Sequence, residues 1–254
     1  MMDSQKKPKE FTDFGFEQVP IETKSMRVGD VFDSVADRYD LMNDLMSFGF
    51  HRAWKNFALS KTALKSGGVA LDIAAGSGDL SKGIAKQVGS DGQVFVTDVN
   101  VRMLNLGRTS LTDAGYAGNI FYAQANAEKL PFDDSQFHCV TIGFGLRNVT
   151  DKLAALAEMY RVLKPGGRLL VLEFSKPKLG IFNSIYDIYS FKILPKLGHL
   201  VTKDSDSYRY LAESIRVHPD QDKLKELMEA EGFERCEYYN LSAGIVALHL
   251  GFKL

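Results

Sequence analysis

A short segment of the chain combines acidic residues with closely spaced glycines. Asp72 opens the run Asp72-Ile73-Ala74-Ala75-Gly76-Ser77-Gly78, and a second acidic residue, Asp98, follows 20 residues after Gly78. Glycines let the backbone turn tightly and approach a ligand closely. A carboxylate at this spacing, at the end of the next strand, suits the two hydroxyls of a ribose. The pattern predicts a nucleoside site formed by Asp72, Gly76, Ser77, Gly78 and Asp98.

A dinucleotide site is the main alternative, because its fingerprint is Gly-x-Gly-x-x-Gly/Ala. Here the third small position is Ser81, and Asp79 stands where the following helix would begin. That helix end normally holds a pyrophosphate, and two anions there repel each other. A cationic sulfonium carrying an α-ammonium group has no such conflict, so the loop favours S-adenosylmethionine. A simple glycine turn without a ligand is the other alternative.

Two further segments lie where a parallel α/β sheet binds ligands, at the carboxyl ends of its strands. Asn126-Ala127-Glu128 follows the third predicted strand, where the adenine edge would be recognised; a solvated helix cap at Asn126 is the alternative. Arg147 and Asn148 follow the fourth predicted strand.

Strands and helices must alternate to position these residues. The expected strands are 69–74, 93–97, 119–124, 137–144 and 168–174, with two more at 235–240 and 245–252. Helices are expected at 79–88, 101–114, 151–163 and 220–231, and a helical pattern interrupted at 47–50 covers 31–64. Lys164-Pro165-Gly166-Gly167 predicts a turn. This order indicates an α/β protein with a mostly parallel sheet covered on both faces.

The remaining parts define the domain organisation. Residues 1–25 are polar and predict a mobile arm, and 26–254 predict a single domain with an aromatic insertion at 176–212. The formal charge of −1 gives no basic field for nucleic acid. Two cysteines, no secretory signal and no long apolar run indicate a soluble, cytoplasmic protein. The five histidines lack metal-ligand spacing, so no metal is expected.

Four longer motifs carry a resemblance. The motifs are Tyr39 to Ser47 with His51 and Trp54, Phe144 to Asp151, Arg161 to Gly167 running on to Glu173-Phe174-Ser175, and Asp206 to Ile215. All four resemble the ubiquinone/menaquinone biosynthesis C-methyltransferases. The match runs from about Phe14 to the C-terminus.

The resemblance implies a class I methyltransferase fold, Rossmann-like, with seven strands of which the last is antiparallel, an N-terminal helical lid and an insertion after strand 5. It implies S-adenosylmethionine-dependent carbon methylation of demethylmenaquinol or 2-methoxy-6-polyprenyl-1,4-benzoquinol, or of both. Ser77, Asp98, Asn126 and Ala127 match cofactor-contacting positions. Gly143 stands where many relatives have a serine assigned to the cofactor, so only a backbone contact is expected there.

Methylation of a ring carbon requires a phenolate, which suggests roles for three residues. Arg147 is a fixed cation that could stabilise the phenolate and, with Asn148, hold a water that relays the proton. Tyr39 could fold over the site and hydrogen-bond a quinol oxygen. The alternatives are a salt bridge for Arg147, a turn or helix cap for Asn148, and a core-edge position for Tyr39.

The aromatic insertion suits a lid over the polyprenyl tail or a helix at the inner face of a membrane, and a dimer contact or ordinary core is the alternative. A homodimer or a complex of quinone biosynthesis is also compatible with the resemblance. Two other functions stay open: methylation of another lipid or small aromatic, and a non-catalytic regulator that binds the cofactor.

Overall fold

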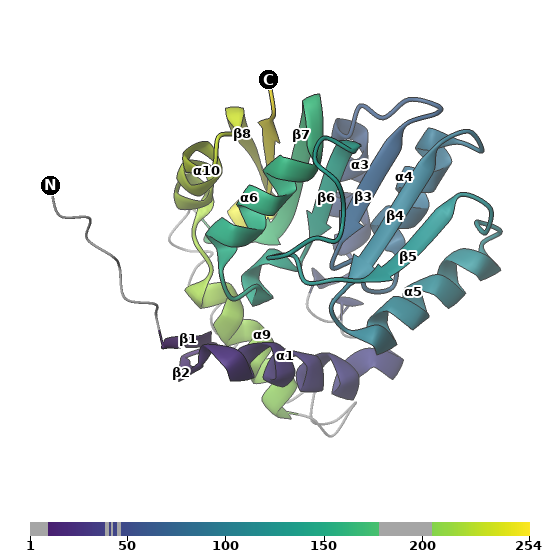
Figure 1. Cartoon of the computed structure of the whole chain (residues 1–254). Coiled ribbons are helices and arrows are strands. Elements are labelled where there is room, and N and C mark those ends of the chain that lie inside the picture. Colours follow the sequence, from purple (N-terminus) through teal and green to yellow (C-terminus); the bar gives the residue numbers. More distant parts are fainter. Residues whose placement is uncertain (1–9, 39–40, 42, 45–46, 178–204) are drawn as a thin grey trace, which may run out of the picture.

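The computed structural model describes residues 10–38, 41, 43–44, 47–177 and 205–254 (Figure 1). Its centre is a seven-stranded sheet in the order β5-β4-β3-β6-β7-β9-β8. The strands are β3 (Val69–Ile73), β4 (Gln93–Asp98), β5 (Ile120–Gln124), β6 (Phe137–Gly143), β7 (Leu163–Phe174), β8 (Glu234–Leu241) and β9 (Val246–Phe252). Neighbours from β5 to β7 pair in parallel, and β9 runs antiparallel to both β7 and β8. The expected fold class, with an antiparallel last strand, is confirmed.

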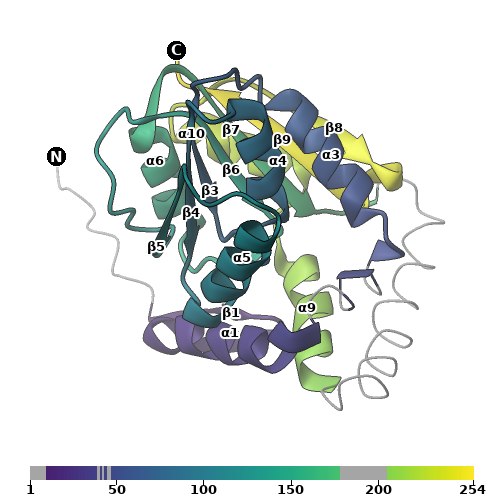
Figure 2. The same cartoon turned by 90° about the vertical axis from the view of Figure 1, so that its right-hand side faces the viewer.

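Helices cover both faces of this sheet (Figure 2). One apolar core joins it to α3 (His51–Lys61), α4 (Asp79–Val88) and α5 (Val101–Asp113), and a second joins it to α6 (Lys152–Val162) and α10 (Gln221–Ala230). Strand residues alternate between the two cores: Ala70 belongs to the first, while Leu71 and Ile73 belong to the second. The alternation directs Asp72 toward α4, where Ser81 lies.

The N-terminal segment corrects one expectation. Residues 11–25, predicted as part of a mobile arm, form the hairpin β1 (Phe11–Phe14) and β2 (Glu17–Pro20) and the start of α1 (Ile21–Val35). The short helix η1 (Ala36–Arg38) follows. Long-range contacts order this polar stretch: Val19 is buried, and the Phe16 N–H donates to the Glu213 carboxylate at 3.1 Å. Sequence periodicity does not reveal such contacts.

A second difference lies at Lys164-Pro165-Gly166-Gly167, where a turn was expected. The helix before it ends at Val162, one residue earlier than predicted, and β7 already begins at Leu163. Leu163 pairs with Phe137 and Arg168 with Cys139, so the intervening residues form an irregularity within the strand. Gly166 takes φ +81° there and its N–H donates to the Lys253 carbonyl, which explains why glycine suits this position.

The carboxyl ends of the parallel strands face two helices from distant parts of the chain. Figure 1 shows α1 and α9 (Ser205–Val217) together at one end of the sheet. The two helices contact each other, and α9 also contacts η2 (Leu146–Asn148), which follows β6. Most of the expected aromatic insertion, residues 178–204, lies outside the described residues. Its last part, Tyr208 and Tyr210, belongs to α9 and is buried.

Candidate active site

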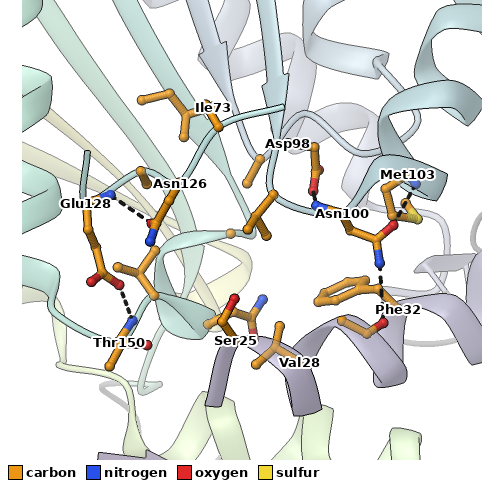
Figure 3. Close-up of a pocket in the computed structure, with 18 of the residues that line it drawn as sticks. Ser25, Val28, Phe32, Ile73, Asp98, Asn100, Met103, Asn126, Glu128 and Thr150 are labelled. Carbon is orange, nitrogen blue, oxygen red and sulfur yellow. Dashed lines mark hydrogen bonds between the residues drawn. The ribbon is translucent and has the colours of Figure 1, made fainter. Parts of the chain in front are cut away.

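A cavity of about 300 Å³ lies between the carboxyl ends of the strands and α1 (Figure 3). The strand ends contribute Ile73 of β3 and Ala74 directly after it, Asp98 of β4, Ala125 after β5 and Phe144 after β6. The opposite wall is formed by residues of α1, namely Ile21, Glu22, Ser25, Val28, Gly29 and Phe32. The helical lid expected at the N-terminus therefore begins ten residues earlier than the sequence pattern indicated, at Ile21 rather than Val31.

Asp98 is held in place by the backbone around it. Its two carboxylate oxygens accept hydrogen bonds from the N–H of Gly76 at 3.0 Å and from the N–H of Asn100 at 2.9 Å. The side chain is 8 % exposed, and burial raises the pKa of Asp98 despite these N–H donors. The glycine loop and the second acidic residue, linked in sequence only by their spacing, thus meet directly at the cavity.

Helix α5 packs very closely against the glycine loop. A Cβ added to Gly107 of α5 would lie 2.6 Å from the Gly76 carbonyl oxygen. On the strand side, Ala74 and Phe144 adopt positive φ angles of 51° and 57°, and both residues line the cavity. Residues in this sparsely populated region of backbone conformation end strands β3 and β6 where they reach the cavity.

Asn126 and Ala127, predicted to contact adenine, lie in the wall beside Asp98. No helix begins at Asn126, so the helix-cap alternative is wrong: its Oδ1 accepts the Glu128 N–H at 3.0 Å within a turn. Glu128 in turn accepts the N–H groups of Thr150 and Asp151 at 2.9 and 3.2 Å. This carboxylate therefore joins the loops after β5 and β6 into one wall.

Helix α1 is fastened to the cavity rim at both ends. Near its start, the buried Lys24 ammonium donates to the Val149 carbonyl at 3.2 Å, and burial lowers the pKa of Lys24 to about 8. Further along, the Asn100 amide donates to the Gly29 carbonyl at 3.3 Å and to the Asp33 carboxylate at 2.9 Å. Asn100 also caps α5 by accepting the Met103 N–H, so the lid is attached to the residues beside Asp98.

The charged side chains among the described residues of the cavity wall are all acidic. Glu22, Asp98 and Glu128 line it, and within the described part of the chain no Lys, Arg or His does. Apolar side chains such as Val28, Phe32 and Met103 form much of the remaining wall. Such a wall favours a ligand that is cationic and partly apolar, and it disfavours a pyrophosphate.

Four residues predicted to contact the cofactor are not among the described cavity-lining residues: Asp72, Ser77, Gly78 and Gly143. Asp72 is buried beneath the loop and accepts hydrogen bonds from Ser81 Oγ at 2.5 Å and Thr141 Oγ1 at 2.7 Å. Burial raises the pKa of Asp72 to about 6. Gly78 caps α4 with φ +81°. A Cβ on Gly143 would meet Leu80 Cδ1 at 2.6 Å, so Leu80 occupies the space that a serine side chain would need.

Arg147, expected as a fixed cation that stabilises the phenolate, lies in a buried ion pair. Its guanidinium donates to the Glu173 carboxylate at 3.0 Å, and the two side chains are 4 % and 1 % exposed. Arg147 also donates to the Phe144 carbonyl, and its own N–H donates to Glu173. Arg147 is not among the described cavity-lining residues. The salt-bridge alternative raised from the sequence describes this arrangement.

Asn148 does line the cavity, and it has a partner that sequence reasoning missed. The Tyr210 hydroxyl donates to Asn148 Oδ1 at 3.0 Å across 62 positions of sequence. Of the two alternatives for Asn148, the helix cap is wrong because Asp151 caps α6. The turn is confirmed, because Asn148 ends the short helical turn η2 and its N–H donates to the Gly145 carbonyl at 3.1 Å. Tyr39 lies outside the described residues. Among those described, no cluster of three or more His, Cys, Asp or Glu has the arrangement of a metal site.

Comparisons with known proteins show which family this chain resembles over its length. The model of the ubiE/COQ5 methyltransferase family matches residues 21–253. The chain is 57 % identical over 253 residues to the ubiquinone/menaquinone biosynthesis C-methyltransferase UbiE of Marinomonas sp., with all of both chains covered. It is 59 % identical to the protein of the same name from Hahella chejuensis, covering 95 % of this chain and 97 % of the relative.

Solved structures show the same fold at lower identity. A SAM-dependent methyltransferase of Thermotoga maritima, described as a possible histamine N-methyltransferase, aligns with a TM-score of 0.64 at 18 % identity, covering 89 % of this chain and 99 % of that one. A putative methyltransferase in complex with the Haloferax volcanii Trm112 activator gives 0.66 at 18 % identity, with coverages of 89 % and 97 %. These two structures bear on the fold alone. The family model and the full-length relatives show that the chain belongs to the ubiE/COQ5 methyltransferase family.

Proposed function

We propose that this protein is an S-adenosylmethionine-dependent C-methyltransferase that methylates the ring of a polyprenylated quinol in ubiquinone or menaquinone biosynthesis. The proposal extends to this chain what the names of its full-length relatives state. Its acceptors would be demethylmenaquinol, 2-methoxy-6-polyprenyl-1,4-benzoquinol, or both.

The cofactor assignment is supported most by the wall of three carboxylates without a described cation. In S-adenosylmethionine the sulfonium and the α-ammonium are positive, so Glu22, Asp98 and Glu128 suit it. Asp98, already oriented by two backbone N–H groups, retains lone pairs for the ribose hydroxyls. Asn126 and Ala127 would contact adenine, and the backbone at Ala74 and Gly76 would meet the amino-acid end. Asp72, Ser77 and Gly78 would shape the loop from behind, and Gly143 at the end of β6 would leave the space that Leu80 of α4 occupies.

The bound cofactor supplies an electrophilic methyl group. On the acceptor, loss of a ring-hydroxyl proton to solvent would place negative charge on the neighbouring carbon. That carbon would take the methyl group as the bond from methyl to sulfur breaks, and the neutral thioether S-adenosylhomocysteine would leave. The ring proton at that carbon leaves afterwards and restores the aromatic ring. The protein must hold the ring in line, stabilise the phenolate and exclude water.

Asn148 and Phe144 would contact the acceptor ring, because they supply an amide and an aromatic side chain to the part of the cavity wall that follows β6. Arg147 would act from behind them: its pairing with Glu173 and its bond to the Phe144 carbonyl set the course of this loop. Tyr39, in the motif that runs from Tyr39 to Ser47, would contact a quinol oxygen.

The polyprenyl tail also calls for an apolar surface, and we extend the proposal to peripheral contact with the inner face of a membrane. Among the described residues no helix is long and apolar enough to span a bilayer. Phe48 and Phe50, before α3, are 71 % and 57 % exposed and could insert into a lipid surface. Vesicle flotation of the wild-type protein and of a Phe48→Ser, Phe50→Ser variant tests this; equal flotation would remove the role of these two residues.

Transfer of a labelled methyl group from S-adenosylmethionine to a benzoquinol and to a naphthoquinol acceptor tests the main proposal. We expect labelled product from at least one of them. Measurable cofactor binding without transfer to either quinol would contradict the proposal and favour a cofactor-binding regulator. Transfer only to other lipids or small aromatics would favour the alternative substrate class.

A further inference from the structure

Tyr210 connects a distant helix to the cavity. Its hydroxyl, delivered by α9, donates to Oδ1 of Asn148 at 3.0 Å, and Asn148 lines the cavity at the carboxyl end of the sheet. The Tyr210 side chain is 5 % exposed. A buried phenol that reaches the wall of a ligand cavity through one hydrogen bond is a candidate for orienting the side chain it binds.

The orientation of the Tyr210 ring is fixed by the N-terminal elements. The ring stacks on Phe14 of β1, with centroids 4.2 Å apart and planes inclined by 21°. Val28 and Val31 of α1 pack with it in the same apolar cluster. Because the ring cannot swing without breaking this stack, the hydroxyl is held at one position relative to Asn148.

The hydrogen bond has a consequence for the other half of the Asn148 amide. With Oδ1 engaged by Tyr210, the two N–H groups of Nδ2 remain, and they have no acceptor among the described residues. The side chain is only partly buried and borders the cavity. An amide N–H directed at a ring oxygen stabilises negative charge that develops there.

We propose that Tyr210 is a positioning residue for methyl transfer: by binding Oδ1 of Asn148, it directs Nδ2 toward the oxygen of the quinol ring hydroxyl and so favours the phenolate. This inference rests on the proposed function. The charged groups facing Tyr210 are Arg147 of η2 and Glu173 of β7. Burial raises the pKa of Tyr210 above its ordinary value, so the phenol keeps the proton that it donates.

Replacement Tyr210→Phe removes the hydroxyl and keeps the ring that stacks on Phe14. We expect kcat to fall roughly tenfold, since an oriented donor to a developing oxyanion is partly lost. The affinity for S-adenosylmethionine should be unchanged, and the acidic limb of the kcat–pH profile should move to higher pH. The control is Tyr238→Phe, which removes a hydroxyl bonded at 2.6 Å to Asp222 on the exposed strand β8 and should leave kcat unchanged.

A double-mutant cycle separates orientation from packing. In an Asn148→Ala background, Tyr210→Phe should have little further effect on kcat, because the group that it orients is gone. Equal losses of kcat in both backgrounds would overturn the inference. A Tyr210→Phe enzyme with lower thermal stability and lower cofactor affinity but an unchanged kcat–pH profile would also overturn it. Such a result would mean that Tyr210 contributes only to packing.

A binding measurement distinguishes this inference from the proposed function. A nitro-substituted naphthol, whose visible absorption reports ionisation of its hydroxyl, should bind wild type with a lower apparent pKa than it shows in Tyr210→Phe. If wild type methylates quinols and this difference is absent, only the inference fails. If wild type neither methylates quinols nor binds the naphthol, both fail.

Discussion

The Arg147 guanidinium donates to the Glu173 carboxylate at 3.0 Å in the protein interior, and Glu173 also accepts the Phe174 N–H at 2.8 Å. Arg147 lies in η2 after β6, and Glu173 is the penultimate residue of β7. The pair therefore ties the two adjacent strand ends together at the rim of the cavity. Arg147 directly precedes Asn148 in η2, so the pair also holds the segment that carries Asn148.

Removal of one partner of this buried ion pair should lower the stability of the protein. Glu173→Gln leaves the Arg147 cation buried without a counter-ion, and we expect a loss of about 3–5 kcal/mol in the free energy of unfolding. Urea titration measures it. The control is Glu226→Gln, which breaks an exposed pair with Lys223 and should cost less than about 1 kcal/mol. Equal, small losses in both variants would show that the buried pair contributes no more than a surface pair.

The Asp98 carboxylate should determine cofactor affinity. Asp98→Asn keeps the size of the side chain but replaces one acceptor oxygen with an amide donor. This donor would face the N–H of either Gly76 or Asn100, which is itself a donor. We expect the affinity for S-adenosylmethionine, measured by calorimetry, to fall at least roughly tenfold, the scale of one charged hydrogen bond. Asp113→Asn, on an exposed residue at the end of α5, should bind as wild type does. Undiminished binding by Asp98→Asn would contradict the ribose assignment.

The close approach of α5 to the glycine loop gives a separate test. An alanine at Gly107 would place Cβ 2.6 Å from the Gly76 carbonyl oxygen, so the helix and the loop must move apart. We expect Gly107→Ala to weaken cofactor binding although alanine favours a helix by about 1 kcal/mol over glycine. Ser110→Ala, an exposed position of the same helix, is the control. Wild-type affinity in Gly107→Ala would show that the loop tolerates the displacement.

The sequence predicted those parts of the fold that depend on local patterns. Helix α4 was predicted with its observed bounds, because apolar periodicity begins directly after Gly78 and ends at Gly89. The start of α1 was missed because Glu22 and Ser25, which line the cavity, resemble the polar residues of a flexible arm. The partners of Arg147 and Asn148 were missed because Glu173 and Tyr210 lie 26 and 62 positions away. Contacts of that range depend on tertiary packing and leave no local pattern.

The buried carboxyl of Asp72 should make stability depend on pH in a specific direction. Burial raises its pKa from 3.8 to about 6, so between these values the folded protein binds more protons than the unfolded chain. Stability contributed by this group is therefore present at pH 4 and is lost as the pH rises through 6, by up to about 3 kcal/mol. Asp72→Asn cannot ionise, so we expect the free energy of unfolding of wild type relative to this variant to decrease between pH 4 and 7. Asp133→Asn, at an exposed position, should show no such trend. A constant difference between wild type and Asp72→Asn would mean that the hydroxyls of Ser81 and Thr141 compensate fully for burial of the charge.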